Sequence, residues 1–293
     1  NGKTASVHIV DNHTNIVEIL KDNKVIFHKT SPIGNTEDSK KIYESLNMED
    51  IYDFAITADI DDVKHILDPQ IVMNSAIAEE GLRGDYGANI GSILKDSYGS
   101  DIKIRAKSKA AAGADARMNG CELPVVINSG SGNQGLTVSL PIIEYARELK
   151  VTEEKLYRAL LISNLSAIHL KTAIGRLSAY CGAVSAGASA GAGIAYLSDV
   201  GYKGITHTIV NALAITSGII CDGAKASCAA KIVSAVDAGI LGLEMYKNGQ
   251  QFYGGDGIIS KGIENTIKNI GLLGQLGMSE TDKEIIRIMT CVD

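Results

Sequence analysis

The sequence predicts a mainly α-helical protein with a small β meander at its N-terminus, and therefore an α+β protein overall. Two patterns predict this: residues 4–29 alternate like short strands between turns, and apolar residues beyond about position 38 recur at helical spacing. The composition agrees, because the 293 residues include 31 Gly but no Trp and only 3 Phe. Small side chains let backbones approach closely, so we expect tightly packed helices.

The N-terminal strands are expected to form a meander of three, and three strands this short need a further surface to pack on. The chain opens Asn1-Gly2-Lys3 without an initiator Met, so we interpret it as the C-terminal fragment of a longer polypeptide. On this interpretation, residues 1–35 are the remnant of a truncated α+β domain. Residues 36–293 then form the helical domain that carries the catalytic site.

Several helix boundaries can be read from the sequence. Helical spacing is present over residues 38–67, with the acidic run Asp59–Asp62 as a solvated helix start, and another helix is expected over about Pro69–Glu80. Thr152 should cap a later helix, and the capping-box pattern Ser279–Asp282 should begin the last one.

An uncharged stretch runs from Leu177 to Ser198 and is long enough to span a bilayer. It consists mostly of Gly, Ala and Ser, with Gly187 and Gly191 at a spacing that lets helices approach closely. Because bulky apolar residues are few, insertion into a membrane would be weakly driven. We therefore expect a buried central helix.

The net charge is −6 and the isoelectric point is about 5.6. These values argue against a nucleic-acid partner, which needs a basic face. The sequence also contains no basic amphipathic helix of the kind that binds a membrane surface. No signal peptide opens the chain, so a cytoplasmic protein is expected, in which the 5 Cys are ligands, reactive thiols or buried hydrophobes. The sequence leaves the oligomeric state open, with a homodimer among the options.

The segment Gly130–Gly135 has the form GxGxxG and precedes a helix. A dinucleotide site would need a second strand and an acidic residue about 20 residues later, whereas the sequence runs straight into another helix. We favour a nest of backbone N–H groups that binds an anion such as a carboxylate; the alternative is a connector without a ligand. The density of amides and hydroxyls favours a ligand, and the candidate substrate-binding residues are Asn128, Ser129, Ser131, Gly132, Asn133 and Gln134.

Cys181, Cys221 and Cys228 lie beside Gly-rich turns. Their spacing matches no zinc finger, whose paired ligands are roughly two to four residues apart, and by spacing alone buried inert thiols are favoured. They could instead hold three irons of a [4Fe–4S] cube and leave the fourth iron open as a Lewis acid. Cys121 and Cys291 lie elsewhere and are interpreted as structural.

Six segments carry a resemblance to a known family: His13–Ile16, Asp115–Met118, Asn128–Gly135, Arg176–Cys181, Gly218–Ala224 and Thr281–Ile286. Together and in this order they resemble the L-cysteine desulfidase family, a single-chain relative of the iron–sulfur L-serine dehydratase α chain. The resemblance covers essentially the whole chain. It implies a [4Fe–4S]-dependent lyase that converts L-cysteine to pyruvate, ammonia and sulfide.

The resemblance also implies that Cys181 and Cys221 are cluster ligands. The third ligand is either Cys228, which resembles a ligand of the serine dehydratases, or an N-terminal Cys of the desulfidases, whose Gly-Cys-Thr-Glu-Pro-like segment does not occur in this sequence. The absence of that segment agrees with a fragment and leaves the activity of this chain open. The sulfurs of Cys181 and Cys221 should lie close together near Gly130–Gly135, and an exposed cluster should be lost in air.

In the implied chemistry, Arg117 or Arg176 helps the nest to hold the substrate carboxylate. A base then removes the Cα proton, and His169, Lys171, His13 or a group outside this chain could serve. Three alternatives stay open: an L-serine dehydratase with hydroxide as leaving group, a non-catalytic binding or structural domain, and a nucleotide-binding oxidoreductase. The last alternative predicts a parallel sheet around the glycine segment.

Overall fold

The computed structural model describes residues 2–10, 15–29, 42–175 and 178–291. The chain forms two compact units, Asn1–Ser45 and Leu46–Asp293, and each is described by itself.

The first unit contains the predicted meander. Strands β1 (Ala5–Ile9), β2 (Ile16–Lys21) and β3 (Lys24–His28) form an antiparallel sheet in the order β1-β2-β3. Asp22 and Asn23 connect β2 to β3 with φ values of 51° and 62°. This left-handed conformation is accessible to Asp and Asn and matches the twist of a two-residue hairpin turn. The prediction of an N-terminal β meander is therefore confirmed.

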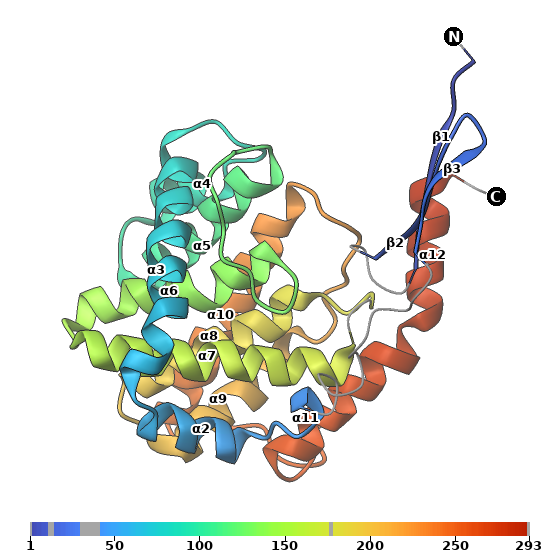
Figure 1. Ribbon diagram of the computed structural model, residues 1–293. Coiled ribbons are helices and arrows are strands. Elements are labelled where there is room, and N and C mark those ends of the chain that lie inside the picture. The colour runs from blue at the N-terminus through green and yellow to red at the C-terminus, as the bar shows by residue number, and fades with distance from the viewer. Residues whose placement is uncertain (1, 11–14, 30–41, 176–177, 292–293) are drawn as a thin grey trace. The chain divides into compact units, whose positions relative to one another are not determined.

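The second unit is helical in all its described regular elements. The helices are α2 (Met48–Thr57), α3 (Ile60–Arg83), α4 (Ile90–Tyr98), α5 (Ile102–Met118), α6 (Gly132–Leu149), α7 (Glu153–Ile174), α8 (Gly182–Leu197), α9 (Gly201–Thr216), α10 (Ser227–Lys247), α11 (Ile263–Leu272) and α12 (Ser279–Thr290), with a π turn over Leu273–Gly277. Helix α8 packs against α6, α7, α9 and α10 and lies in the middle of the unit (Figure 1).

Helix α8 is the buried central helix that the sequence predicts. No side chain separates its backbone from α10, because a Cβ built on Gly191 would lie 2.8 Å from Gly239 Cα, and one built on Gly239 would lie 2.4 Å from Gly187 O. These glycines let two helices approach closer than any other residue would allow. Among the described helices, none is long and apolar enough to cross a membrane.

Three predicted helix starts, at Asp59, Thr152 and Ser279, are confirmed, whereas the start at Pro69 is wrong and Ser279 does not cap its helix. Asp59 and Thr152 cap α3 and α7 as expected, each accepting a hydrogen bond from a backbone N–H of the first turn. Pro69 does not begin a helix: it lies inside α3, where burial of Leu67 and Gln70 stabilises the turn despite the missing N–H. Ser279 is not an N-cap, since Met278 occupies that position and no side chain caps α12.

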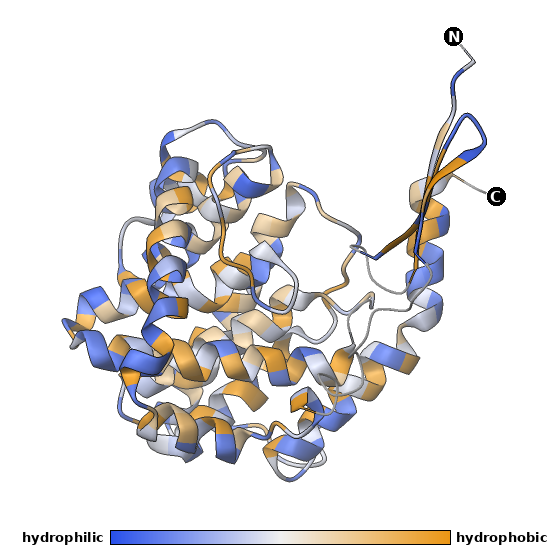
Figure 2. Cartoon of the chain, in the orientation of Figure 1, coloured by the Kyte–Doolittle hydropathy of each residue, from blue (hydrophilic) through white to orange (hydrophobic). Residues whose placement is uncertain are grey.

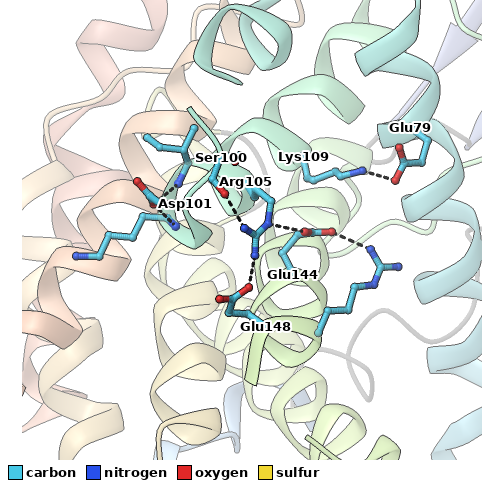
Figure 3. A network of polar contacts seen from close by, with 10 residues as sticks. Glu79, Ser100, Asp101, Arg105, Lys109, Glu144 and Glu148 are labelled. Atoms are coloured by element: carbon cyan, nitrogen blue, oxygen red, sulfur yellow. Dashed lines mark hydrogen bonds and ion pairs between the residues drawn. The ribbon is translucent and has the colours of Figure 1, made fainter. Parts of the chain in front are cut away.

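Ion pairs connect α3, α5 and α6 across the surface of the helical unit (Figure 3). Arg105 donates to Ser100 O at 2.6 Å and to Glu148 at 2.5 Å, and lies 3.6 Å from Glu144. Helix α12 carries both hydrophobic and hydrophilic residues along its length, and none of them is buried (Figure 2).

The parallel sheet that the nucleotide-binding alternative predicts is not present among the described residues. In the described part of the chain the only sheet is the antiparallel β1-β2-β3 meander, and residues around Gly130–Gly135 contribute only an isolated bridge between Asn128 and Ser131. A dinucleotide site needs a parallel βαβ unit at its glycine segment.

The glycine contact between α8 and α10 gives a first testable prediction. Gly239→Ala should lower the free energy of unfolding by about 1–3 kcal/mol, because the added methyl would meet the Gly187 carbonyl. Chemical denaturation measures this. Gly218→Ala is the control, since a Cβ there meets nothing within 4 Å. Equal stability of both variants would contradict the packing argument.

Candidate active site

The structure brings together two cysteines that lie far apart in the sequence. Tyr180 and Ile220 form an antiparallel bridge. Beside it, Cys181 N–H donates to Ile219 O at 3.2 Å and Cys221 N–H donates to Ala179 O at 2.6 Å. Cys181 is also the N-cap residue of α8. The backbone thus joins the start of the central helix to the segment that follows α9.

The thiols of these two residues interact directly. A hydrogen bond from Cys181 to the sulfur of Cys221, together with burial, raises the pKa of Cys181 well above its usual range. The same hydrogen bond lowers the pKa of Cys221 to about 6, and the N–H of Gly223 and the charges of Lys231 and Lys171 act in the same direction. These shifts favour the thiolate at Cys221 and the protonated thiol at Cys181, and a thiolate is the form that binds metals.

Cys228 lies in the first turn of α10, where its sulfur donates to Gly223 O at 3.6 Å. Lys231 follows one turn later and interacts electrostatically with Cys181, Cys221 and Cys228. Its ammonium donates to Ile220 O at 3.0 Å and forms an ion pair with Asp222. The three predicted ligands therefore all interact electrostatically with one lysine.

A [4Fe–4S] cluster, which the resemblance implies, is bound by thiolates. The described residues include no group of three or more His, Cys, Asp or Glu that could hold a single metal ion. Soft thiolates are the ligands that iron–sulfur clusters select. Cys181, Cys221 and Cys228 can supply three such sulfurs, so the chemistry of this donor set fits such a cluster.

The segment in which a nest is predicted is the turn before α6. Ser129 and Gly130 have φ values of 50° and 79°, and Ser131 caps the helix by accepting a hydrogen bond from Gln134 N at 3.4 Å. Gly135 allows close contact with the preceding segment, because a Cβ there would lie 2.0 Å from Val126 O. Backbone N–H groups at such a helix start are suited to an anion.

Gln134 connects this helix start to the cysteines. A Cβ built on Gly182, the residue after Cys181, would lie 2.7 Å from Gln134 Nε2. The Gln134 side chain is buried, and its Oε1 has no hydrogen-bond partner in the described structure. A buried acceptor without a partner is costly unless a ligand or water satisfies it. This atom marks the junction of α6 and α8 as a place for a polar ligand.

Arg117 lies at the same helix start. Its Nη1 donates to Asn133 Oδ1 at 3.2 Å, and a Cβ built on Gly132 would lie 2.2 Å from its Nε. The predicted association of Arg117, Gly132 and Asn133 is thus present in the structure, with a guanidinium beside the N–H groups of α6. The arrangement is suited to a carboxylate, which a guanidinium binds strongly.

Asn128 and Ser129 are engaged within the protein. Asn128 Nδ2 donates to Asn164 O at 3.1 Å and to Asn164 Oδ1 at 3.0 Å, while Ser129 Oγ donates to Asn128 Oδ1 at 2.8 Å. From α3, Asn74 donates to Gly135 O at 3.2 Å and accepts from Val126 N at 2.9 Å. These amides shape the turn.

The two base candidates on α7 have different surroundings. His169 Nε2 lies 2.8 Å from Glu264 Oε2, and the other oxygen of Glu264 accepts from Met48 N at 2.8 Å, so His169 connects α7 to α11. Burial lowers the pKa of Lys171, and the sulfurs of Cys221 and Cys181 act in the opposite direction. Of the two, Lys171 is the one beside the cysteines. His13 and Arg176, also predicted as site residues, lie outside the described residues.

Sequence reasoning missed Asn74, Asn164 and Lys231. Lys231 had a signal, because residues three apart on a helix share a face and Lys231 follows Cys228 at that distance. Asn74 and Asn164 had no such signal, because the sequence does not distinguish a buried Asn on an amphipathic helix from an exposed polar residue.

Residues 13–287 match the family described as serine dehydratase alpha chain. The chain belongs to the serine dehydratase alpha chain family, whose description points to a lyase. It is 62% identical to a UPF0597 protein of Desulfitobacterium hafniense over 97% of this chain and 66% of that protein.

Two further relatives are UPF0597 proteins. The identity is 56% for the protein of Lachnoclostridium phytofermentans, over 97% of this chain and 67% of that protein. It is 50% for the protein of Finegoldia magna, over 98% of this chain and 68% of that protein. The chain thus spans about two thirds of the length of these relatives. No solved structure matches it.

Asp115, two residues before Arg117, is completely buried and accepts a hydrogen bond from Gly91 N at 3.0 Å at the start of α4. Burial raises the pKa of Asp115 to about 6, against the opposing effect of the Gly91 and Ile90 N–H groups. Because this value lies above that of an unfolded chain, about 3.9, protonation favours the folded state. The stabilising effect is full below about pH 4 and is lost as the pH rises through 6.

A second prediction follows from this carboxyl. Relative to Asp115→Asn, the wild-type chain should lose about 1–3 kcal/mol of unfolding free energy between pH 4 and 7.5. Urea denaturation across this range provides the measurement. A difference that does not vary with pH would show that Asp115 does not titrate as its burial predicts.

Proposed function

We propose that this chain carries the cluster-binding and catalytic part of a [4Fe–4S]-dependent lyase that acts on a small amino acid. L-Cysteine is the proposed substrate, and pyruvate, ammonia and sulfide are the products. The observation that carries this proposal is the contact between Cys181 and Cys221 beside the start of α6. Membership of the serine dehydratase alpha chain family supports the reaction class.

In this proposal Cys181, Cys221 and Cys228 hold the cluster. When bound with one open iron, the cluster supplies a Lewis acid for the leaving group. The Cys221 thiolate is already favoured by the charge of Lys231, which prepares one ligand for iron.

The residues at the start of α6 would bind the substrate. The backbone N–H groups that follow Ser131 would donate hydrogen bonds to the carboxylate, and the guanidinium of Arg117 would add a second, charged donor. The free Oε1 of Gln134 is placed to accept from the substrate ammonium. Three contacts of this kind would hold the substrate in one orientation, so that its Cα–H bond points toward the base.

Lys171 is the proposed base. Because burial lowers its pKa, a larger fraction of its side chain is the neutral amine that can accept the Cα proton. As this proton moves to Lys171 Nζ, the electron pair of the Cα–H bond forms the Cα–Cβ double bond and the Cβ–S pair leaves with the sulfur. The released aminoacrylate takes up water and yields pyruvate and ammonia.

The second candidate is L-serine dehydratase. The description of the family favours it, and the same contacts to carboxylate and ammonium would serve, with the hydroxyl as the leaving group. The two substrates differ only in the leaving atom, which is sulfur in cysteine and oxygen in serine. None of the residues named above is proposed to contact this atom.

The proposal is tested by anaerobic reconstitution with iron and sulfide, applied to this chain and to the full-length Desulfitobacterium hafniense relative. We expect a thiolate-to-iron charge-transfer absorbance, and sulfide with pyruvate from L-cysteine. Pyruvate from L-serine alone would instead establish the dehydratase. If neither protein takes up a cluster, both enzymes are excluded and a non-catalytic domain remains.

A third prediction concerns the ligands. Cys181→Ala, Cys221→Ala and Cys228→Ala should each reduce iron per chain after reconstitution by about tenfold or more, because each removes a thiolate. Iron and acid-labile sulfide analysis measures this. Cys121→Ala is the matched control, a half-buried thiol outside the group. Full iron content in the Cys228 variant would exclude it as the third ligand.

A fourth prediction concerns the base. Lys171→Met should lower kcat by about 10²–10⁴-fold and abolish exchange of the Cα proton with deuterated solvent. In the wild type, the rate should rise with pH towards the lowered pKa of Lys171, since the neutral amine is the active form. His169→Gln is the comparison, expected to alter stability more than proton exchange. Unchanged exchange in the Lys171 variant would refute the assignment.

A further inference from the structure

Lys231 takes no part in the substrate binding and proton transfer described above, yet it is the charged residue with which all three cysteines interact. Its side chain is 20% exposed, and it comes from α10, one turn after Cys228. Burial alone would lower its pKa, but the hydrogen bond and charge of Asp222 and the charges of Cys181 and Cys228 raise it above the usual value. The ammonium therefore keeps its charge in this position.

Two contacts hold the ammonium in place. It is paired with the Asp222 carboxylate and donates to Ile220 O at 3.0 Å, on both sides of Cys221 in the sequence. Ile220 is also the residue that bridges Tyr180, next to Cys181. Lys231 thus connects α10 to the backbone segment that presents the first two thiols.

The charge balance at the site makes such a cation necessary. Three thiolates on a [4Fe–4S] core of charge 2+ leave a net negative charge, and a negative charge in a partly buried place is costly without a partner. Asp222 would add to that cost if it stood alone, but its carboxylate is neutralised by Lys231 and by Lys225 at 3.7 Å. Of these two lysines, Lys231 is the one that interacts electrostatically with the sulfurs.

We propose that Lys231 is a positioning residue that fixes the Ile220–Asp222 segment and places one positive charge among Cys181, Cys221 and Cys228. Its function is to favour assembly and retention of a thiolate-bound iron–sulfur group. This inference rests on the proposed function for the group that is retained. The contacts that hold Lys231 do not depend on it.

The fifth prediction compares Lys231→Met, Lys231→Arg and Lys225→Met in the reconstituted full chain. Lys225→Met is the matched control, because Lys225 pairs with the same carboxylate but is 42% exposed. We expect Lys231→Met to lose its cluster to EDTA about tenfold faster or more, and Lys231→Arg and Lys225→Met to remain close to wild type. Bleaching of the charge-transfer absorbance gives the rate.

A second measurement uses the chain without iron. Iodoacetamide modification of Cys221 at pH 7, followed by mass spectrometry, should be several-fold slower in Lys231→Met than in Lys225→Met, because the neighbouring cation promotes thiolate reactivity. Lys231→Arg keeps the positive charge and should react at a rate close to that of the wild type. If Lys231→Met fails to fold, Lys231→Gln, which keeps a polar side chain, is measured in its place.

The two measurements separate the inference from the function on which it rests. If wild-type chain binds no iron but alkylation still depends on Lys231, the cluster proposal fails and the placement of the charge stands. If Lys231→Met and Lys225→Met behave alike in both measurements, Lys231 is an ordinary surface ion pair and the inference is overturned.

Discussion

The close approach of α8 and α10 is the constraint on which the rest of the helical unit depends. Gly187, Gly191 and Gly239 leave no side chain between the two backbones, so α8 can be surrounded by four helices at once. Packing without voids makes such a crossing rigid. The start of α8 carries Cys181 and the start of α10 carries Cys228, so the same crossing positions both sulfurs. A site held by helix ends in this way needs little further scaffolding.

Charge at the site is divided between two lysines in opposite environments. Lys231 is held charged by Asp222, whereas burial lowers the pKa of Lys171. Groups of one type whose surroundings push their pKa values apart commonly have separate roles in catalysis. A charged lysine can favour thiolates, and a lysine with a lowered pKa can take up a proton. Both interact with Cys221, whose pKa of about 6 reflects the cations and the hydrogen bond from Cys181.

The glycine turn before α6 shows how structural and ligand-directed polar groups are mixed in one segment. The side chain of Asn128 donates a hydrogen bond to Asn164, and the hydroxyl of Ser131 caps α6. Gln134 differs from them, since its buried Oε1 has no partner among the described residues and lies at the junction with α8. An unpaired buried acceptor is expensive, which is why it indicates a ligand more strongly than the density of amides does.

The sequence by itself determined the fold class, the buried central helix and the segments that contain the site, because hydrophobic period, helix caps and runs of small residues are local properties. It misplaced the helix start at Pro69, where burial of neighbouring residues outweighs the proline. It placed the start of α12 correctly at Ser279, although the matching pattern there makes no cap. Only the tertiary structure decided that Cys181 and Cys221 touch and that Lys231 joins them. Such contacts depend on how α8, α9 and α10 cross, and no local pattern encodes a crossing between residues so distant in the chain.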